Sequence, residues 1–302
     1  MNDAPEAIIC SSPDLSGDAN RVVLVTGAGK GLGAAFATAW ARRGASVIAN
    51  NRHHGDGQPS AESLALRLRA EGADVDADLN AVDAPGAAQR IIADLLARHG
   101  RLDALVLNAG ITGAAVKIPD MDETALHEVM AINFFACAEL VRAALPLISA
   151  SPAGRILFIS STGGLYGVRG RSAYAASKGA VNGYALSLAA EQRRAGIGVN
   201  VLCPYAATAM TAASNTEADP RLSPDGAAAA AVWLTSSVCQ ATGQIWVAGA
   251  GRVRRAMAME GESIGDAVTP EWLAANTGEV EMTGAQGFAS GEAAFADFYK
   301  SL

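Results

Sequence analysis

Short, uninterrupted apolar runs alternate with longer helix-forming stretches along most of this chain. The runs are rich in β-branched residues and leucine, which is typical of buried strands in a parallel sheet. They lie at residues 22–25, 47–49, 104–107, 156–159, 199–202 and 245–247. The stretches between them predict helices at residues 34–43, 60–70, 87–98, 123–147, 172–194 and 227–236. Repeated strand–helix–strand units of this kind require a parallel sheet covered by helices on both faces.

Glycines join the first predicted strand to the first predicted helix. Residues 26–33 read Thr-Gly-Ala-Gly-Lys-Gly-Leu-Gly. Glycines at such a junction let the backbone turn tightly and approach a pyrophosphate, which is held by the positive end of the helix dipole. An ordinary loop of small residues is the structural alternative. The candidate cofactor-binding residues are Gly27, Gly29, Lys30, Gly31, Leu32 and Gly33.

Three hydroxyl and amino side chains in the middle of the chain can form a proton-transfer device. If residues 172–194 are helical, Tyr174 and Lys178 share one face. An ammonium near a phenol favours the phenolate and lowers a pKa that is otherwise about 10. Ser161 follows a predicted strand and can hold a carbonyl oxygen while the tyrosine gives or takes the proton. A surface helix pair is the alternative for Tyr174 and Lys178, and Ser160 is the alternative to Ser161.

These motifs together resemble those of the short-chain dehydrogenase/reductase family, from residue 21 to residue 251. The resemblance implies a single Rossmann-type, doubly wound parallel sheet with helices on both faces, here followed by a C-terminal helical extension. It assigns catalysis to Ser161, Tyr174 and Lys178, with Asn133 supporting a proton relay and Lys178 also holding the nicotinamide ribose. It places Asn108, Ala109, Gly110, Tyr174, Lys178, Pro204 and Ala207 beside the cofactor.

The choice of cofactor depends on the residues after the second predicted strand. An acidic side chain there accepts hydrogen bonds from the adenosine ribose of NAD. This chain instead has Asn51 and Arg52. Arg52 can bind a 2′-phosphate, and Lys30 adds a second cation. The sequence therefore predicts NADP(H) as the preferred cofactor, with NAD(H) as the alternative. The alternative for Arg52 itself is a solvated loop side chain that binds no phosphate.

The expected reaction is hydride transfer between the nicotinamide and a ketone or secondary alcohol, with Tyr174 as general acid or base. The predicted substrate contacts are Ser161, Thr162, Gly163, Tyr166 and Tyr205. Residues 205–225 are rich in small and polar residues and are expected to form a lid over the nicotinamide. No metal site is predicted, because the four histidines and four cysteines form no cluster of ligands.

A narrower resemblance concerns the second half of the chain. Residues 204–211, 247–251 and 269–271 resemble the (3R)-hydroxyacyl-CoA dehydrogenase unit of multifunctional enzyme type 2, a branch that includes 17β-hydroxysteroid dehydrogenases. The likeness breaks at Asn51 and Arg52, where that branch carries an aspartate. An NAD-dependent (3R)-hydroxyacyl-CoA or hydroxysteroid dehydrogenase is thus the alternative function. A non-catalytic NADP-sensing protein on the same fold is the remote one, since all four catalytic residues are present.

Composition and charge limit the partners. The net charge is −7 and no basic stretch stands out, so nucleic acid and membrane surfaces are not expected partners. Separated cysteines and the lack of a basic, apolar leader suggest reduced thiols in a cytoplasmic protein. A small-molecule carbonyl or alcohol is the expected substrate, and the resemblance implies a homodimer or homotetramer. The expected organisation is a flexible tail (1–20), a dinucleotide-binding and catalytic domain (21–251) and an extension packing on the core or a neighbouring subunit (252–302).

Overall fold

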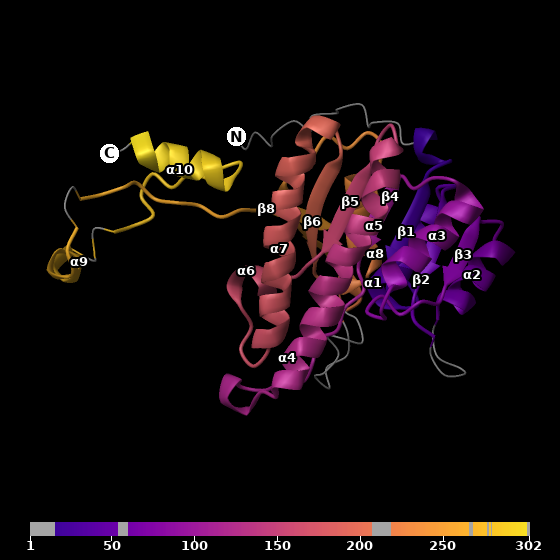
Figure 1. Cartoon of the computed structure of the whole chain (residues 1–302), viewed down its shortest axis with the longest axis horizontal. Helices are drawn as coiled ribbons and strands as arrows, with labels where there is room; N and C mark the ends of the chain where they lie inside the picture. The colour runs from indigo at the N-terminus through magenta and orange to yellow at the C-terminus, as the bar shows by residue number, and fades with distance from the viewer. Residues whose placement is uncertain are drawn as a thin grey trace, which may run out of the picture.

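The structure, a computed structural model, describes residues 16–53, 60–206, 219–265, 268–276, 278 and 280–300. Its centre is an eight-stranded sheet of order β3-β2-β1-β4-β5-β6-β7-β8, shown in Figure 1. Neighbouring strands are parallel from β3 to β7, and β8 runs antiparallel to β7. The strands are β1 (Val22–Thr26), β2 (Ser46–Asn50), β3 (Val75–Asp78), β4 (Ala104–Leu107), β5 (Arg155–Ile159), β6 (Gly198–Pro204), β7 (Gln244–Gly249) and β8 (Arg252–Ala256). The predicted doubly wound fold is confirmed.

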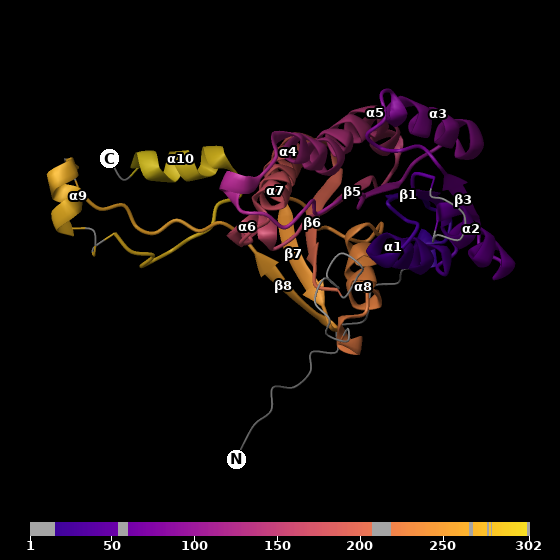
Figure 2. The ribbon, with the colours of Figure 1, turned by 90° about the horizontal axis from the view of Figure 1, so that it is seen from below.

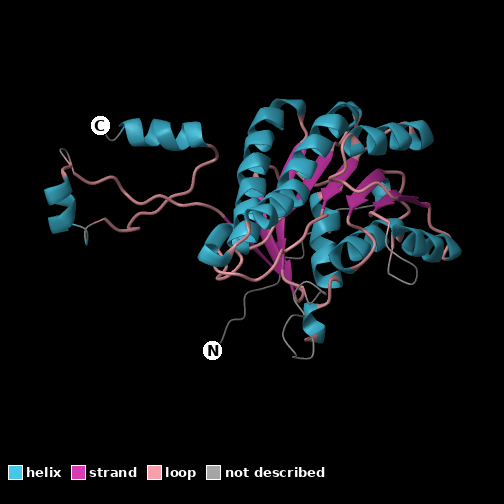
Figure 3. Ribbon diagram, turned by 60° about the horizontal axis from the view of Figure 1, so that its bottom comes forward, coloured by secondary structure: helices cyan, strands magenta, loops and turns pink. Residues whose placement is uncertain are grey.

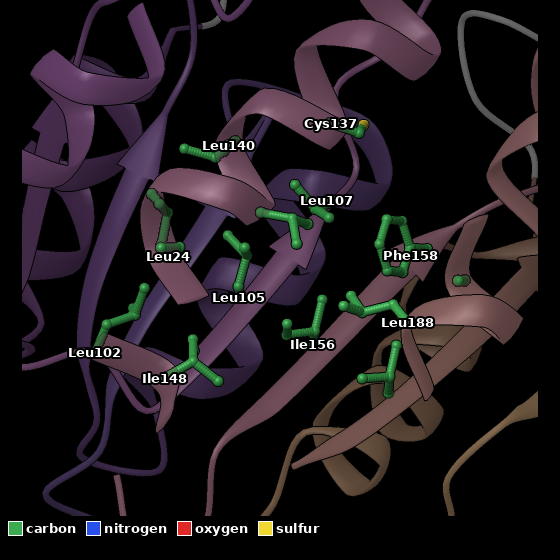
Figure 4. Close-up of a cluster of buried hydrophobic side chains, with 14 of the residues drawn as sticks. Leu24, Leu102, Leu105, Leu107, Cys137, Leu140, Ile148, Ile156, Phe158 and Leu188 are labelled. Carbon is green, nitrogen blue, oxygen red and sulfur yellow. The ribbon is translucent and has the colours of Figure 1, made fainter. Parts of the chain in front are cut away.

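Helices cover both faces of this sheet, as Figure 2 shows. One layer contains α3 (Ala87–His99), α5 (Ala136–Ala150) and α7 (Ser172–Gln192), and the other contains α1 (Gly31–Ala41), α2 (Ala61–Ala70) and α8 (Asp225–Leu234). Each layer buries a separate apolar core against the sheet, because strands buried on both faces carry apolar side chains on both. Figure 4 shows the first core, in which Leu105 and Phe158 of the sheet lie beside Leu140 and Leu188 of the helices. The short helices are η1 (Ser16–Asp18), η2 (Ile118–Asp120), α6 (Gly163–Tyr166), η4 (Arg193–Ala195) and η5 (Pro220–Leu222).

The two outermost strands differ from the sequence prediction. Residues of β3 read Val-Asp-Ala-Asp, and only Val75 is buried. Residues of β8 read Arg-Val-Arg-Arg-Ala, and no strand was predicted there. In the structure β8 pairs along its whole length with β7. An edge strand tolerates polar residues because one side has no strand neighbour, so it lacks the apolar run that marks a central strand.

The long helix predicted at residues 123–147 is interrupted. It begins as α4 (Glu123–Met130), widens into a π-helical turn η3 (Ala131–Phe135) and continues as α5. The π-turn contains Asn133, whose side chain is buried. By length and apolar composition alone, the run Glu123–Ala150 would be long enough to cross a membrane. It lies in the helical layer over the sheet, however, and core helices of soluble proteins meet the same criteria.

A network of charged side chains lies at the amino-terminal ends of the central strands. Arg21, just before β1, donates to the carbonyl oxygens of Asp103 (3.0 Å) and Ala153 (2.9 Å). Its Nε lies 3.7 Å from Oδ1 of Asp18, which also accepts a hydrogen bond from the amide of Ser237 (2.9 Å). Asp18 and Arg21 are both buried. The packed core therefore begins before residue 21, whereas residues 1–15 of the predicted tail lie outside the described residues.

Beyond β8 the chain forms an arm, defined here as residues 257–300, that extends away from the sheet and its helices (Figures 1 and 3). Within it, Glu260 and Gln286 form an antiparallel bridge that brings its outgoing and returning segments together. The arm ends in two helices, α9 (Pro270–Asn276) and α10 (Gly291–Lys300). Met257, Met259, Met282, Phe295 and Tyr299 are all exposed on it.

Candidate active site

The glycine loop between β1 and α1 has the geometry of a phosphate-binding turn. Gly27 has φ +64°, a backbone conformation that favours glycine. A Cβ atom on Gly33 would collide with the carbonyl oxygen of Gly27, so the helix can start this close to the turn only with glycine there. No side chain caps the first turn of α1, where Lys30 is the N-cap residue. Its N–H groups are therefore available to an anion.

Asn108 and Thr26 hold the segment after β4 against this loop. The Nδ2 atom of Asn108 donates to the carbonyl oxygens of Thr26 (2.9 Å) and Gly27 (3.2 Å). In return, Oγ1 of Thr26 accepts from the amides of Asn108 (2.9 Å) and Ala109 (3.0 Å). A Cβ atom on Gly110 would lie 3.6 Å from Nζ of Lys178. The predicted cofactor residues that follow β1 and β4 thus lie together, next to Lys178.

Polar side chains cluster at the carboxyl end of β2. The side-chain amide of Asn51 packs against Gly29, so closely that a Cβ atom on Gly29 would collide with it. Arg52 and Lys30, the latter in the glycine loop, are both exposed. One carboxylate bonded to the end of β2 was not predicted from the sequence, Asp78 at the end of β3. Its Oδ1 accepts from Asn50 Nδ2 (2.6 Å), so this carboxylate is engaged within the protein. The paired ends of β1 and β2 place Lys30 and Arg52 on loops that leave the same edge of the sheet.

Ser161 and Tyr174 form the hydroxyl pair that the sequence predicted. Ser161 follows β5, and its Oγ accepts a hydrogen bond from the amide of Gly163 (3.0 Å) and bonds with the phenol of Tyr174. Tyr174 lies in the first turn of α7. Burial raises the pKa of this phenol above its ordinary value, while the bond with Ser161 and the charge of Arg171 lower it. The expected net lowering is therefore not found, because desolvation of the phenolate is the largest effect.

Lys178 lies one turn further along α7 and is 5% exposed. Its Nζ donates to the carbonyl oxygen of Ile159 (2.8 Å) and lies 5.9 Å from the centroid of the Tyr174 ring. Burial lowers the pKa of its ammonium. Burial also raises the pKa of the nearby Cys137 and Cys203 thiols to about 11, so both are neutral at physiological pH. The three cysteines in the described part of the chain are free and buried.

Asn133 joins the π-turn to the catalytic helix. Its Oδ1 accepts from the amide of Ile111 (2.8 Å), and its Nδ2 donates to the carbonyl oxygen of Ile111 (2.9 Å) and to Oγ of Ser177 (2.9 Å). Ser177 in turn donates to the carbonyl oxygen of Tyr174 (2.8 Å). Ser177 was not predicted as a site residue, although it lies within the Tyr-x-x-x-Lys motif, directly before Lys178. The two residues together fix α7 against the segment after β4.

The predicted substrate contacts around Ser161 differ in how deeply they are buried. A Cβ atom on Gly163 would lie 2.8 Å from Cγ2 of Val168, 3.4 Å from Ser161 Oγ and 3.7 Å from Tyr174 Cε1, so glycine at this position lets Val168 pack close to the two hydroxyl-bearing side chains. Thr162 is half-buried next to it, whereas Tyr166 at the end of α6 is 79% exposed. Tyr205 follows β6 and is partly exposed.

On the cofactor side of this region, Pro204 ends β6 opposite Ala248 of β7. The predicted contact Ala207 lies outside the described residues, as does most of the predicted lid, because residues 207–218 are not described.

Comparison with known proteins places this geometry in a family. The model of the short chain dehydrogenase family matches residues 21–219. Peroxisomal multifunctional enzyme type 2 of Mus musculus is 35% identical over 239 residues, which are 76% of this chain and 32% of that protein. This chain therefore spans about a third of the length of that relative.

Two solved structures extend the similarity to the arrangement of the elements. Full-length peroxisomal multifunctional enzyme type 2 from Drosophila melanogaster superposes with a TM-score of 0.78 at 25% identity, covering 93% of this chain and 49% of that one. A short chain dehydrogenase from Shigella flexneri, complexed with NADP, has a TM-score of 0.70 at 30% identity and covers 77% of this chain and 97% of its own. The match over most of the chain, together with the serine, tyrosine and lysine around the end of β5, shows that this protein belongs to the short-chain dehydrogenase/reductase family of oxidoreductases.

Proposed function

We propose that this protein is an NADP(H)-dependent oxidoreductase that transfers hydride between the nicotinamide and a ketone or secondary alcohol. The observation that carries this proposal is the arrangement of Ser161, Tyr174 and Lys178. The first two are hydrogen-bonded, and the third lies one helical turn further on, next to Gly110 and the cofactor loop. The uncapped start of α1 and the crowded glycines suit a bound dinucleotide.

Each of these side chains has a distinct task. The dinucleotide supplies or accepts the hydride when it is bound. Tyr174 gives its proton to the carbonyl oxygen during reduction and takes it back during alcohol oxidation. Ser161 orients that oxygen, and Lys178 lies where it can hold the nicotinamide ribose and supply charge near the phenol. Asn133 holds α7 through Ser177 and supports the proton relay that reprotonates Tyr174 after it has given up its proton.

The preference for NADP(H) rests on the end of β2. None of the three described residues that follow Asn50, Asn51 to His53, is a carboxylate, and the nearby Asp78 is already bonded to Asn50 and Asn80. Arg52 and Lys30 are exposed cations on loops leaving the same edge. A 2′-phosphate carries the charge that these two side chains complement, whereas residues 51–53 offer the free ribose hydroxyl of NAD no acidic partner.

Arg52→Asp is expected to weaken NADPH binding by about 10- to 100-fold, because a charge-assisted hydrogen bond is replaced by a repulsive pair. Fluorescence titration with NADPH and NADH measures both dissociation constants. Arg43→Asp is the matched control, since Arg43 is also exposed but follows α1 at its far end. Tighter NADH than NADPH binding by the unaltered protein, or an unchanged NADPH affinity in Arg52→Asp, would contradict the preference.

The similarity to multifunctional enzyme type 2 supports a second candidate, an NAD-dependent (3R)-hydroxyacyl-CoA or hydroxysteroid dehydrogenase. It uses the same Tyr174 chemistry and differs in cofactor and substrate. The same titration separates the two, because this candidate requires NADH to bind more tightly. If it does, oxidation of (3R)-hydroxyacyl-CoA and of hydroxysteroids becomes the first activity to assay.

We further propose that the arm docks on a second copy of this chain, giving a homodimer or homotetramer. The arm exposes apolar side chains while extending away from the rest of its own subunit (Figure 1). It is also acidic, with eight aspartates and glutamates and one lysine between residues 257 and 302. Strand β8, by contrast, exposes Arg252 and Arg254 at the edge of the sheet. An acidic arm and an arginine-bearing edge in each copy are complementary in charge.

Sedimentation of the full chain at micromolar concentration is expected to show a dimer or tetramer. The double substitution Arg252→Glu and Arg254→Glu should shift this toward monomer by making the edge repel the acidic arm, and the shift should shrink in high salt. Arg193→Glu with Arg194→Glu, on the exposed turn after α7, provides a control of equal charge change. A monomeric wild-type protein, or an equal shift in the control, would count against this interface.

A further inference from the structure

Two segments near Tyr174 are joined by hydrogen bonds, and this junction is called the seam below. The first, residues 111–121, follows the Asn108–Gly110 region, and the second, residues 168–172, leads into α7. The amide of Val116 donates to the carbonyl oxygen of Gly170 (2.9 Å), and Arg171 Nη1 donates to that of Gly113 (2.8 Å). The space left between the segments is about 20 Å³, room for about one water molecule.

Arg171 is held firmly at its place in this seam. Its amide donates to the carbonyl oxygen of Val168 (3.1 Å), and its own carbonyl accepts from the amide of Ala175 (2.9 Å). Its partner Gly113 has φ +65°, and a Cβ atom there would lie 2.9 Å from Val129 of α4. The carbonyl that receives the guanidinium is therefore oriented by a backbone conformation that favours glycine.

The two segments joined by Arg171 lead to Asn133 on one side and to Tyr174 on the other. Ile111, at the start of the first, is bonded through both amide and carbonyl to Asn133. Tyr174 lies three residues beyond Arg171 in the first turn of α7. One guanidinium thus connects the segment that receives Asn133 to the helix that presents the phenol.

We propose that Arg171 is a positioning residue of the reaction, which fixes the catalytic tyrosine against the segment bonded to Asn133 and places a positive charge beside the phenol. This inference rests on the proposed function of Tyr174 as acid and base.

The groups around the phenol explain why this charge matters. Tyr174 faces Ser161 after β5, Cys203 of β6, Lys178 one turn along α7, and Arg171 before α7. Burial raises the pKa of the phenol, the bond with Ser161 lowers it, the negative charge of Cys203 raises it when that thiol is ionised, and Arg171 lowers it. Lys178 directs its Nζ at the carbonyl of Ile159. Removing the Arg171 charge should therefore move the ionisation of Tyr174 to higher pH.

The experiment compares wild type, Arg171→Met, Arg171→Lys and Arg169→Met. Arg169 is a neighbouring exposed arginine and serves as the matched control. Ionisation of the phenol is followed by NMR with ¹³C-labelled tyrosine, and Tyr174→Phe identifies its signal among the five tyrosines. The pH dependence of alcohol oxidation is measured in parallel. Wild-type turnover tests the proposed function, while the NMR titration reports on Arg171 whether or not a substrate is turned over.

Arg171→Met should move the titration midpoint of Tyr174 to higher pH and lower kcat for oxidation on the acid side of the profile about two- to tenfold. Arg171→Lys should restore the midpoint, and Arg169→Met should leave it in place. An unmoved midpoint in Arg171→Met, or an equal movement in Arg169→Met, overturns the proposal. If Arg171→Met does not fold, Arg171→Gln replaces it, since its amide can still donate to Gly113 but carries no charge.

Discussion

Replacement of Tyr174 by phenylalanine is expected to lower kcat by about 10²–10⁴-fold, the usual contribution of a positioned acid or base. The substitution removes only the phenolic oxygen, which bonds with Ser161, and leaves the ring in the first turn of α7. Cofactor affinity should stay within about twofold, because the glycine loop and the Asn108 contacts do not involve this oxygen. Nicotinamide absorbance with a panel of ketones and secondary alcohols measures turnover.

Tyr184→Phe is the matched control for that experiment. Tyr184 lies on the same helix, where its ring packs edge-on against Phe134 and Phe158, away from Ser161. Loss of its hydroxyl should leave kcat nearly unchanged. Substantial turnover by Tyr174→Phe, with the control also active, would remove Tyr174 from the proton-transfer step and the proposed mechanism with it.

The largest effect on stability is expected from Arg21→Met, which should lower the free energy of unfolding by about 3–5 kcal/mol. Methionine keeps much of the side-chain volume but leaves Asp18 as a buried carboxylate without its cation. It also leaves the carbonyl oxygen of Ala153 without the donor that it now has. Urea unfolding followed by circular dichroism measures the change.

Arg42→Met provides the comparison for a surface pair. Nη2 of Arg42 lies 3.4 Å from Oε2 of Glu71, and both side chains are exposed. Loss of this ion pair should therefore lower the free energy of unfolding by at most about 1 kcal/mol. Adding Asp18→Asn to Arg21→Met should recover part of the stability, since a buried amide costs less than a buried charge. An equal decrease in the free energy of unfolding in Arg21→Met and Arg42→Met would show that the buried network around Arg21 contributes little to stability.

The central part of the fold could be predicted because each central strand is apolar on both faces. Residues 22–25 and 156–159 form unbroken apolar runs, and they became β1 and β5. Residues 75–78 and 252–256 could not be identified in this way. Each lies at an edge of the sheet, where solvent replaces a neighbouring strand and selection for apolar side chains is relaxed. The π-turn was equally hidden, because it changes which carbonyl each amide reaches without changing the apolar pattern.

In the site, the spacing of Tyr174 and Lys178 was predictable because a helix places residues four apart on one face. Arg171 was not, since it precedes the helix and acts through a backbone carbonyl 58 residues away in the sequence. Ser177 was missed for a similar reason: a serine inside a helix is ordinary until its partner Asn133 is located. Contacts with main-chain atoms of distant segments leave no pattern in a single sequence.

The π-turn at residues 131–135 also restricts how this protein can change in length. A widened turn accommodates one more residue than regular helix would over the same span. Deleting one residue there would restore regular winding with α4 and α5 still facing as they do now, although it would disturb the turn that holds Asn133. Deleting one residue elsewhere in this helix would instead rotate α4 by about 100° relative to α5. Val129 of α4 would then leave the interior where it is now buried, and the contact with Gly113 would be lost. We therefore expect insertions and deletions to be tolerated in the loops on either side of this helix long before they are tolerated within it.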